Sequence, residues 1–362
     1  MKIAQICPRY SPDIGGVETH VKEISERLVN AGHKVEVITT DPTGRLNKQE
    51  TINGVKVVRF TSFAPGNAYY LAPQILFYLR SRKYDIIHMH SYHALPALFA
   101  ALGKGQEKLV FTPHYHRSGH TPFRNLLHKP YRFLGKIIFS RADYVICVSE
   151  YEKKLVESDF KVGGKIVKIP NGINLKEFKK IKNQEKNSTE KILLYVGRLE
   201  EYKGIQYIIQ SLPELQEFRL KVIGKGPFES ELHDIAKNLQ VENKIEWLKE
   251  LSREELLDCY ADADIFLMLS THEAYGITVA EALASGTPCI VAKGSALEEF
   301  VDGIHCFGLD EPNNKKSIIK LIHQAENLKN NSEFIVEKLN IFDWNQITEE
   351  IENVYRKQTL AR

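Results

Sequence analysis

Residues 265–288 read IFLMLSTHEAYGITVAEALASGTP. The apolar run 265–269 predicts a buried strand, and the run from Ile277 to Ala284 predicts a helix that ends at the Ser-Gly-Thr-Pro sequence. A buried strand that leads through a short loop into a helix is the repeating unit of a parallel sheet covered by helices. The stretch therefore predicts an α/β fold.

Two carboxylates stand eight positions apart in this stretch, Glu273 before the helix and Glu281 within it. A helical rise of about 1.5 Å per residue plus a short loop places the two carboxyl groups roughly 10–15 Å apart. The carboxyls of a glycosidase acid/base pair lie only about 5–9.5 Å apart, so the spacing argues against one bond-cleaving pair. Helix N-termini beyond the strand ends of such sheets bind phosphate. The spacing therefore indicates two contacts along an extended ligand, and a sugar nucleotide has that shape.

The alternative is that Glu273 is an ordinary acid at a helix N-terminus and Glu281 a solvated helix residue. However, the helix around Glu281 is apolar nearly all round, which predicts that this carboxylate is buried and needs a polar partner. Vicinal ribose hydroxyls would suit it.

The composition limits the class of protein. With 362 residues the chain is long enough for two domains, and a net charge of +3 does not indicate a nucleic-acid partner. No Cys-x-x-Cys occurs, no apolar run approaches the ~20 residues that cross a bilayer, and a predicted strand directly follows Met1-Lys2, so no signal peptide is expected. These features predict a cytoplasmic protein, soluble or peripheral to the inner face of the membrane.

Strands and helices follow one another twice along the chain. Residues 2–39 form a first predicted βαβ unit, residues 174–191 are polar and rich in lysine, and a second series of strands and helices begins at Ile192. This pattern predicts two Rossmann-like domains joined by a polar connection.

Glycines and cations follow the first strand of each predicted domain. Gly15-Gly16 would let backbone N–H groups approach a ligand, although a structural turn is about equally compatible with the pair. In the second domain Gly197-Arg198 ends a strand and Lys203 opens the next helix, which puts two cations near one strand end, where a diphosphate binds well. The alternative is an exposed pair balanced by Glu200 and Glu201.

Two further loops allow a binding or a structural role. Gly224-Lys225-Gly226-Pro227 follows the next strand and would either contact a base or form a plain turn. Asp262-Ala263-Asp264 matches the Asp-x-Asp pattern of some metal-dependent sugar transferases. Because it precedes the strand at 265–269, we expect it at the amino end of that strand, away from ligand, in a cap or turn.

Histidines follow a predicted strand of the first domain. His114 lies closest to the strand end, and His116, His120 and His128 come after it at irregular spacing without a nearby acidic residue. This pattern argues against a metal site within the segment. We expect His114 to hydrogen-bond a sugar or to polarise the reacting region.

Residues 104–141 form a basic stretch with a single acid, Glu107. Its cations are Lys104, Lys108, Arg117, Arg124, Lys129, Arg132, Lys136 and Arg141. Apolar residues alternate with these cations, so the stretch predicts either an amphipathic helix that rests on anionic lipid or a helix packed on its own sheet.

Together these motifs resemble those of the retaining glycosyltransferases of family GT4. They are Gly15-Gly16, His114, Asn171-Gly172-Ile173, Gly197-Arg198-Leu199 with Lys203-Gly204, Glu273 with Gly276 and Glu281, and Ala284-Ser285-Gly286-Thr287-Pro288. The resemblance spans the whole chain, and Trp344 and Tyr355 are similar to residues of the family's final helix.

The resemblance implies the GT-B fold, in which two Rossmann-like domains face each other across a cleft. Residues 1–172 would bind a glycan or lipid-linked acceptor and would include a C-terminal helix, 344–362, that crosses back onto them. Residues 173–343 would bind the nucleotide sugar.

The resemblance also implies residue roles. Arg198 and Lys203 would stabilise the diphosphate leaving group, Glu281 would bind ribose, and Glu273 would orient the donor sugar. His114 would approach that sugar from the first domain. The other donor-binding positions would be Gly15, Gly16, Gly197, Lys225, Gly226, Tyr275, Gly276 and Ile277. No cofactor or metal would be required, because fixed cations and helix N-termini neutralise the departing phosphate.

Other activities stay open at this point. A GT-B epimerase of sugar nucleotides or a GT-B phosphorylase would share the fold, although no lysine stands out as a pyridoxal phosphate ligand. A non-catalytic subunit that binds nucleotide sugars would share the motifs. The chain departs from the family pattern at Asn174, Leu269 and Cys306, none of which is an expected phosphate contact.

Overall fold

The computed structural model describes residues 1–117, 122–179, 190–326 and 336–357. The chain forms two compact units: Met1–Asn171 with Trp344–Arg362, and Gly172–Asp343. The domain boundary predicted from the sequence lies one residue later, between 172 and 173. Residues 180–189, in the predicted polar connection, lie outside the described residues.

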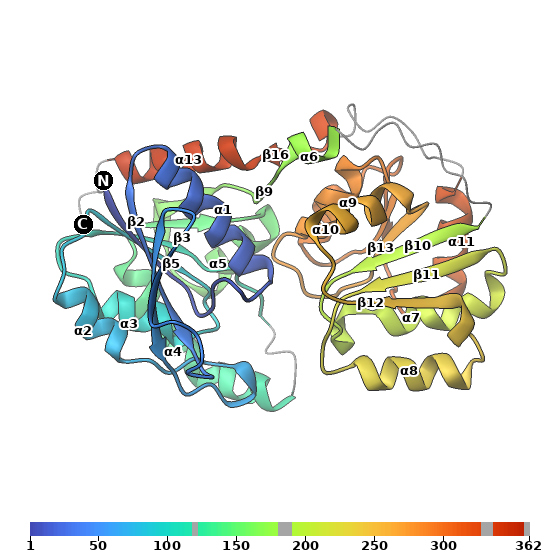
Figure 1. Cartoon of the computed structure of the whole chain (residues 1–362), viewed down its shortest axis with the longest axis horizontal. Coiled ribbons are helices and arrows are strands. Elements are labelled where there is room, and N and C mark those ends of the chain that lie inside the picture. Colours follow the sequence, from blue (N-terminus) through green and yellow to red (C-terminus); the bar gives the residue numbers. More distant parts are fainter. Residues whose placement is uncertain (118–121, 180–189, 327–335, 358–362) are drawn as a thin grey trace. The chain divides into compact units, whose positions relative to one another are not determined.

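The first unit is built on an eight-stranded sheet in the order β3-β4-β2-β1-β5-β6-β7-β8 (Figure 1). Neighbouring strands are parallel, except that β3 runs antiparallel to β4. The strands are β1 (Lys2–Ile6), β2 (Lys34–Asp41), β3 (Gln49–Ile52), β4 (Val55–Thr61), β5 (Ile86–His90), β6 (Lys108–Thr112), β7 (Tyr144–Cys147) and β8 (Ile166–Lys168). The central strands are almost completely buried, as expected of a parallel sheet covered by helices on both faces.

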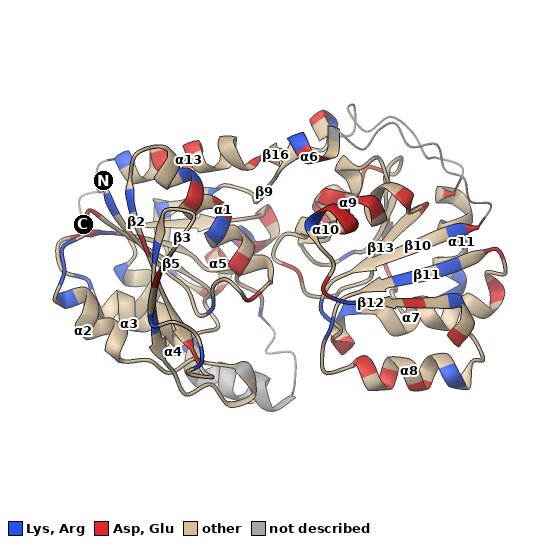
Figure 2. Ribbon diagram, viewed as in Figure 1, with Lys and Arg blue, Asp and Glu red and all other residues tan. Residues whose placement is uncertain are grey.

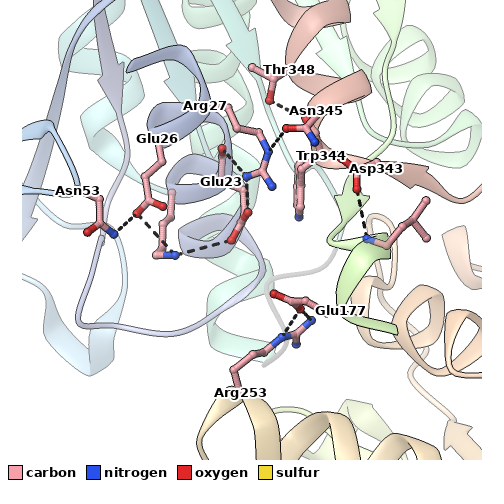
Figure 3. Close-up of polar contacts among 12 residues, drawn as sticks. Glu23, Glu26, Arg27, Asn53, Glu177, Arg253, Asp343, Trp344, Asn345 and Thr348 are labelled. Atoms are coloured by element: carbon pink, nitrogen blue, oxygen red, sulfur yellow. Dashed lines mark hydrogen bonds and ion pairs between the residues drawn. The ribbon is translucent and has the colours of Figure 1, made fainter. Parts of the chain in front are cut away.

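Six α-helices of the described chain belong to this unit. They are α1 (Gly16–Asn30), α2 (Gln74–Arg80), α3 (Leu95–Gly103), α4 (Pro122–Arg141), α5 (Glu150–Asp159) and, from the end of the chain, α13 (Trp344–Arg356). Helix α13 packs on α1, because Arg27 Nε donates a hydrogen bond to Asn345 Oδ1 over 3.0 Å (Figure 3). Trp344 also contacts the ring of His20. The last helix therefore completes the first unit.

The second unit is built on a six-stranded parallel sheet in the order β12-β11-β10-β13-β14-β15. Its strands are β10 (Lys191–Val196), β11 (Phe218–Ile223), β12 (Ile245–Leu248), β13 (Ile265–Met268), β14 (Cys289–Ala292) and β15 (Cys306–Leu309), and a separate parallel pair joins β9 (Gly172–Ile173) to β16 (Phe342–Asp343). Its α-helices are α6 (Leu175–Lys179), α7 (Ile205–Ser211), α8 (Glu229–Asn238), α9 (Arg253–Asp262), α10 (Ile277–Ala284) and α11 (Lys315–Ala325). The predicted strand and helix of the 265–288 stretch are thus β13 and α10.

Each sheet has a point where the order of its strands reverses. β1 lies between β2 and β5 in the first unit, and β10 lies between β11 and β13 in the second. Loops on the two sides of such a point diverge, and ligands bind beyond the carboxyl ends of the strands there. At the opposite edge of the second sheet, Asp264 precedes β13 and accepts a hydrogen bond from the Ile192 backbone N–H over 2.6 Å. The Asp-x-Asp pair therefore lies where the sequence placed it.

Charged residues of both signs are interspersed over both units (Figure 2). Within the described ranges, no helix is both long enough and apolar enough to cross a membrane.

Candidate functional site

The loops after β10 and β11 lie against each other at the carboxyl edge of the second sheet. The Leu199 N–H donates to the Lys225 carbonyl over 3.2 Å. Gly224 has a φ of 148°, and a Cβ at this position would overlap the carbonyl oxygen of Gly197. A glycine is needed here because only its backbone allows the two loops this close. The glycines predicted from the sequence therefore allow the loop that carries Arg198 to pack against the loop that carries Lys225.

Arg198 and Lys203 both follow β10, as predicted, but their environments differ. The Arg198 side chain is 52% exposed and pairs with Glu200 at 2.7 Å. The Lys203 side chain is only 13% exposed and forms an ion pair with Glu273. Although burial opposes its charge, the neighbouring Glu273 carboxylate raises the pKa of Lys203 above its usual range. Lys203 is therefore a poorly hydrated cation held by Glu273, whereas Arg198 is half exposed to solvent.

The Lys203–Glu273 ion pair joins the loop after β10 to the loop after β13, and the sequence did not predict it. The Thr271 N–H also donates to the Tyr202 carbonyl over 3.1 Å, which ties the same two loops together. The Glu273 carboxylate thus lies beside the Lys203 ammonium group, at the point where the order of the strands in the second sheet reverses.

The turn before α10 is held by packing. Gly276 has a φ of 106°, and a Cβ there would collide with the side chain of Leu297. Tyr275 is buried and its ring contacts that of Phe300 edge to face, with centroids 5.3 Å apart. Ile277 begins the helix four residues after Glu273, and the first N–H groups of a helix have no carbonyl partner within it. This end of α10 offers backbone donors to an anion.

Glu281 is buried, as predicted, but its partners are protein groups. Arg253 Nη1 lies 2.7 Å from Glu281 Oε1, and the Tyr260 hydroxyl donates to Oε2 over 2.9 Å. Burial raises the pKa of Glu281, and the Arg253 guanidinium opposes that rise. A buried charge needs a partner in the folded protein itself, and Arg253 supplies it, while the expected contact of Glu281 with ribose hydroxyls stays a prediction.

Arg253 was missed by sequence reasoning because it lies on a different helix, α9. Its guanidinium also bonds Glu177 at 2.8 Å, on α6 (Figure 3). A capping box of Ser252 and Glu255 fixes the start of α9 and so places Arg253 one residue into the helix. The capping pattern was readable from the sequence, but the direction of the side chain was not.

Lys225 and Gly226 lie at the rim of the site. The Lys225 side chain is exposed and pairs with Glu250 at 3.3 Å. A Cβ on Gly226 would overlap the carbonyl oxygen of Leu199, so this glycine serves the close approach of the two loops. The structure therefore shows that Gly226 serves a tight turn, whereas contact between this loop and a nucleotide base stays a prediction.

In the first unit, Gly15 and Gly16 stand at the start of α1, after β1. Gly15 is the N-cap with extended backbone, and a Cβ on Gly16 would meet open space. Glu18 in the first turn binds Arg9 at 2.8 Å. A Cβ on Gly15 would collide with the Glu18 carboxylate, so this carboxylate lies against the start of α1.

His114 follows β6 in a left-handed backbone conformation, with a φ of 47°. Its side chain is partly exposed, while its Nε2 is buried without a hydrogen-bond partner. The ring lies 5.0 Å from that of His20, centroid to centroid. His116 stacks on His93, and His120 and the side chain of His128 lie outside the described residues.

Five of the six cations of the basic stretch whose side chains the structure describes contact acidic groups or carbonyls of their own unit, and the sixth, Lys136, is exposed. Lys104 pairs with Asp143, Arg117 and Arg132 pair with Asp159, and Lys108 and Arg141 donate to backbone carbonyls. Tyr131 of α4 is buried in the core, so this helix packs on its own sheet. The side chains of Arg124 and Lys129 lie outside the described residues.

Two family models cover most of the chain. One, described as Glycosyltransferase Family 4, matches residues 14–177, and one described as Glycosyl transferases group 1 matches residues 176–339. The chain is 31% identical to an uncharacterized glycosyltransferase of Methanocaldococcus jannaschii over 98% of both chains. It is 28% identical to the alpha-monoglucosyldiacylglycerol synthase of Streptococcus pneumoniae, over 82% of this chain and 71% of the relative. It is 26% identical to a GDP-mannose:cellobiosyl-diphosphopolyprenol alpha-mannosyltransferase of Xanthomonas oryzae, over 79% and 77%.

Solved structures share the fold along the whole chain. Sucrose-phosphate synthase of Thermosynechococcus elongatus superposes with a TM-score of 0.80 at 20% identity, covering 98% of both chains. Anabaena HepE in complex with UDP and glucose superposes with a TM-score of 0.77 at 20% identity, covering 99% of this chain and 100% of that one. These likenesses, together with the parallel sheets, confirm the predicted fold class.

Proposed function

This chain belongs to the group 1 glycosyltransferases with a family 4 N-terminal region, and on that premise we propose that it is a retaining hexosyltransferase. It would move a hexose from a nucleoside-diphosphate sugar to a glycan or lipid-linked acceptor. The observation that carries this proposal is the Lys203–Glu273 ion pair at the point where the strand order reverses, with Arg198 on the same loop. The name of one relative prints a glucosylated diacylglycerol and that of another a glycan on a diphosphopolyprenol, which supports the acceptor class.

In the proposed reaction, the bond between the sugar C1 and the diphosphate oxygen breaks while C1 bonds to an acceptor oxygen on the same face. The departing phosphate takes the proton of the acceptor hydroxyl. Lys203 and Arg198 stabilise the charge that develops on the diphosphate, and the N-terminus of α10 adds backbone donors. Glu273 holds Lys203 in place and orients the donor sugar. The chemistry then rests on electrostatics and positioning, without a protein nucleophile or a catalytic metal.

The remaining predicted roles belong to the same proposal. Glu281, anchored by Arg253, keeps lone pairs that can accept ribose hydroxyls. The proposal also retains Gly15, Gly16 and His114 of the first unit as contacts of phosphate and sugar, and Lys225 with Gly226 as contacts of the base.

The donor base can be identified by thermal unfolding in the presence of UDP, GDP and ADP sugars. A ligand at 100 times its dissociation constant adds about 2.7 kcal/mol of stability. For a unit of this size we expect a rise of roughly 5–10 °C for one base and a smaller one for the others. Absence of any rise with all three would contradict the proposal. Formation of an epimer without an acceptor, or a requirement for inorganic phosphate, would favour the epimerase or the phosphorylase instead.

We further propose that the enzyme is cytoplasmic and touches an anionic membrane through the exposed face of α4, while the buried face of this helix packs in the core of the first unit. Phe133 on this helix is 68% exposed and stands beside the half-exposed Arg132. An exposed aromatic next to cations is typical of helices that lie in the membrane interface.

Neutralising Arg124, Lys129, Arg132 and Lys136 together should weaken binding to liposomes that contain anionic lipid. Each cation near such a surface contributes about 1 kcal/mol, so the loss should exceed about 10-fold in a flotation assay. A matched variant that neutralises Lys237, Lys249, Lys316 and Lys320 of the second unit controls for net charge. Equal liposome binding by both variants would rule this surface out.

A further inference from the structure

A buried carboxylate stands behind the loop that carries His114. Glu152 lies in the first turn of α5, and none of its surface is exposed to solvent. Its Oε1 accepts a hydrogen bond from the Tyr115 N–H over 2.5 Å, and its Oε2 accepts one from the Val148 N–H over 2.6 Å. One side chain therefore ties the loop after β6 to the residue that follows β7.

The start of α5 holds Glu152 in place for these contacts. Ser149 is the N-cap of the helix, and its side chain accepts a hydrogen bond from the Glu152 N–H over 3.0 Å. In a capping box, a glutamate at this position turns back to the N–H of the cap residue. The carboxylate of Glu152 reaches past the cap to N–H groups of the two loops. The sequence from Ser149 to Glu152 thus has the spacing of a capping box, but its glutamate serves the neighbouring loop.

His114 lies directly before Tyr115 and has a left-handed backbone, with a φ of 47°. Such a conformation is unfavourable for a residue with a Cβ and persists only where the surrounding structure holds it. Hydrogen bonds on both sides of His114 hold it. The Pro113 carbonyl accepts from the Tyr92 N–H over 2.7 Å, and the Tyr115 N–H donates to Glu152. Glu152 is therefore one of two backbone anchors that enclose His114.

The direction of the His114 ring depends on these anchors. Its Nε2 is buried and has no hydrogen-bond partner among the residues that the structure describes. The ring contacts His20 edge to face, and such packing tolerates small rotations better than a hydrogen bond does. Because the direction of a side chain follows the backbone of its own residue, a shift of the Tyr115 N–H would turn the ring.

Helix α5 also holds the side chain of Tyr115. The Tyr115 hydroxyl donates to Asp159 Oδ2 over 2.8 Å, and Asp159 is the last residue of the helix. This contact fixes the far end of the ring, whereas the Glu152 contact acts on the backbone N–H next to His114. The two ends of α5 thus grip the same residue.

We propose that Glu152 is a positioning residue of sugar transfer, which holds the backbone at Tyr115 and thereby sets the ring of His114 against the donor sugar. The inference rests on the proposed function, in which His114 approaches that sugar. A carboxylate suits this role because its two oxygens accept from two N–H donors at once, and hydrogen bonds to a charged acceptor are the stronger ones. A glutamine would offer one oxygen and would turn an NH₂ group toward the other donor.

The alternative is that Glu152 only stabilises the fold of the first unit. Both roles predict a lower unfolding midpoint when the carboxylate is lost. Only a positioning role predicts that the loss of rate passes through His114, so the test compares single and double variants of the full chain.

Glu152→Gln should lower kcat about 10–100-fold, because a displacement of about 1 Å at a reacting group can cost 100-fold. The KM for the nucleotide sugar should stay unchanged, since the second unit binds most of the donor in the proposed function. His114→Ala should lose at least as much, and the double variant should be no slower than His114→Ala. Glu157→Gln removes the same charge at an exposed position of α5 and should transfer sugar like the wild type.

A second variant covers the case that Glu152→Gln does not fold. Glu152→Asp keeps the charge but is one methylene too short to reach both N–H groups. It should show the same loss of kcat and the same dependence on His114, with folding checked by circular dichroism.

NMR of histidine rings gives a readout that needs no turnover. In protein labelled with ¹⁵N-histidine, the signal missing from His114→Ala identifies His114. This signal should shift in Glu152→Gln and keep its position in Glu157→Gln. If no nucleotide sugar supports transfer, the proposed function fails, and the signal still tests whether Glu152 sets the ring. The inference is overturned by a wild-type kcat in Glu152→Gln, by single losses that multiply in the double variant, or by an unmoved His114 signal.

Discussion

Replacing Arg198 or Lys203 with alanine should reduce sugar transfer by about 10²–10³-fold, the usual cost of removing one group that stabilises a developing oxyanion. Both side chains follow β10 at the edge where ligands bind such sheets. Most of the loss should appear in kcat, because the charge on the leaving diphosphate is greatest in the transition state. Lys237→Ala, on the exposed face of α8, removes the same charge elsewhere and should leave the rate unchanged.

The two variants should differ in stability. Arg198 is half exposed and paired at the surface, so its removal should change the free energy of unfolding by less than about 1 kcal/mol. Removing Lys203 leaves Glu273, which is 17% exposed, without its cation, and should lower the unfolding midpoint measurably. Initial rates and thermal unfolding of the same preparations separate these effects. Full activity in both variants would refute the assigned leaving-group role.

The Glu281→Ala variant should lose about 3 kcal/mol of stability, or roughly 6–12 °C in unfolding midpoint. The substitution leaves the Arg253 guanidinium without its closest carboxylate and the Tyr260 hydroxyl without its acceptor. Arg253 keeps Glu177 and is partly exposed, so the cost should stay at the lower end of the range for a broken buried pair. Differential scanning calorimetry measures the loss.

Arg253→Met is the matched variant for Glu281. It breaks the same ion pair while leaving the carboxylate present, so it should destabilise the second unit with a smaller effect on nucleotide affinity. Glu281→Ala should lower both stability and affinity if the carboxylate also binds ribose. If both variants lost the same nucleotide affinity, Glu281 would have only a structural role as the partner of Arg253.

The elements of the second unit were largely predictable because each carries its own local signal. Helix α10 has the predicted bounds, Ile277–Ala284, since an apolar run there meets a Ser-Gly-Thr-Pro stop. Strand β3 was not predicted. It is a short edge strand whose residues are all partly or fully exposed, and it gains its structure from antiparallel pairing with β4.

The candidate site was predictable as a set of residues but not as a set of contacts. The sequence placed Lys203 and Glu273 after different strands, and only the strand order puts β10 beside β13. The burial of Glu281 followed from the apolar helix around it, whereas its partner Arg253 depends on how two helices lie together. Long-range pairs of this kind leave no periodic signal in the chain.

The histidines around His114 show the same limit more strongly. The rings beside His114 belong to His20 and His90, which the strand order β1-β5-β6 brings together, and no spacing within one segment of the sequence shows this.

The most direct test of the donor site is a calorimetric titration that compares the nucleoside diphosphate of the preferred base with its monophosphate. Contacts between a cation and a phosphate contribute about 1.5–3 kcal/mol each, so the diphosphate should bind the wild type at least about 10-fold more tightly. Arg198→Ala and Lys203→Ala should remove most of that difference, while Lys237→Ala keeps it. Equal binding of the two nucleotides by the wild type, or an unchanged difference in both site variants, would contradict the account.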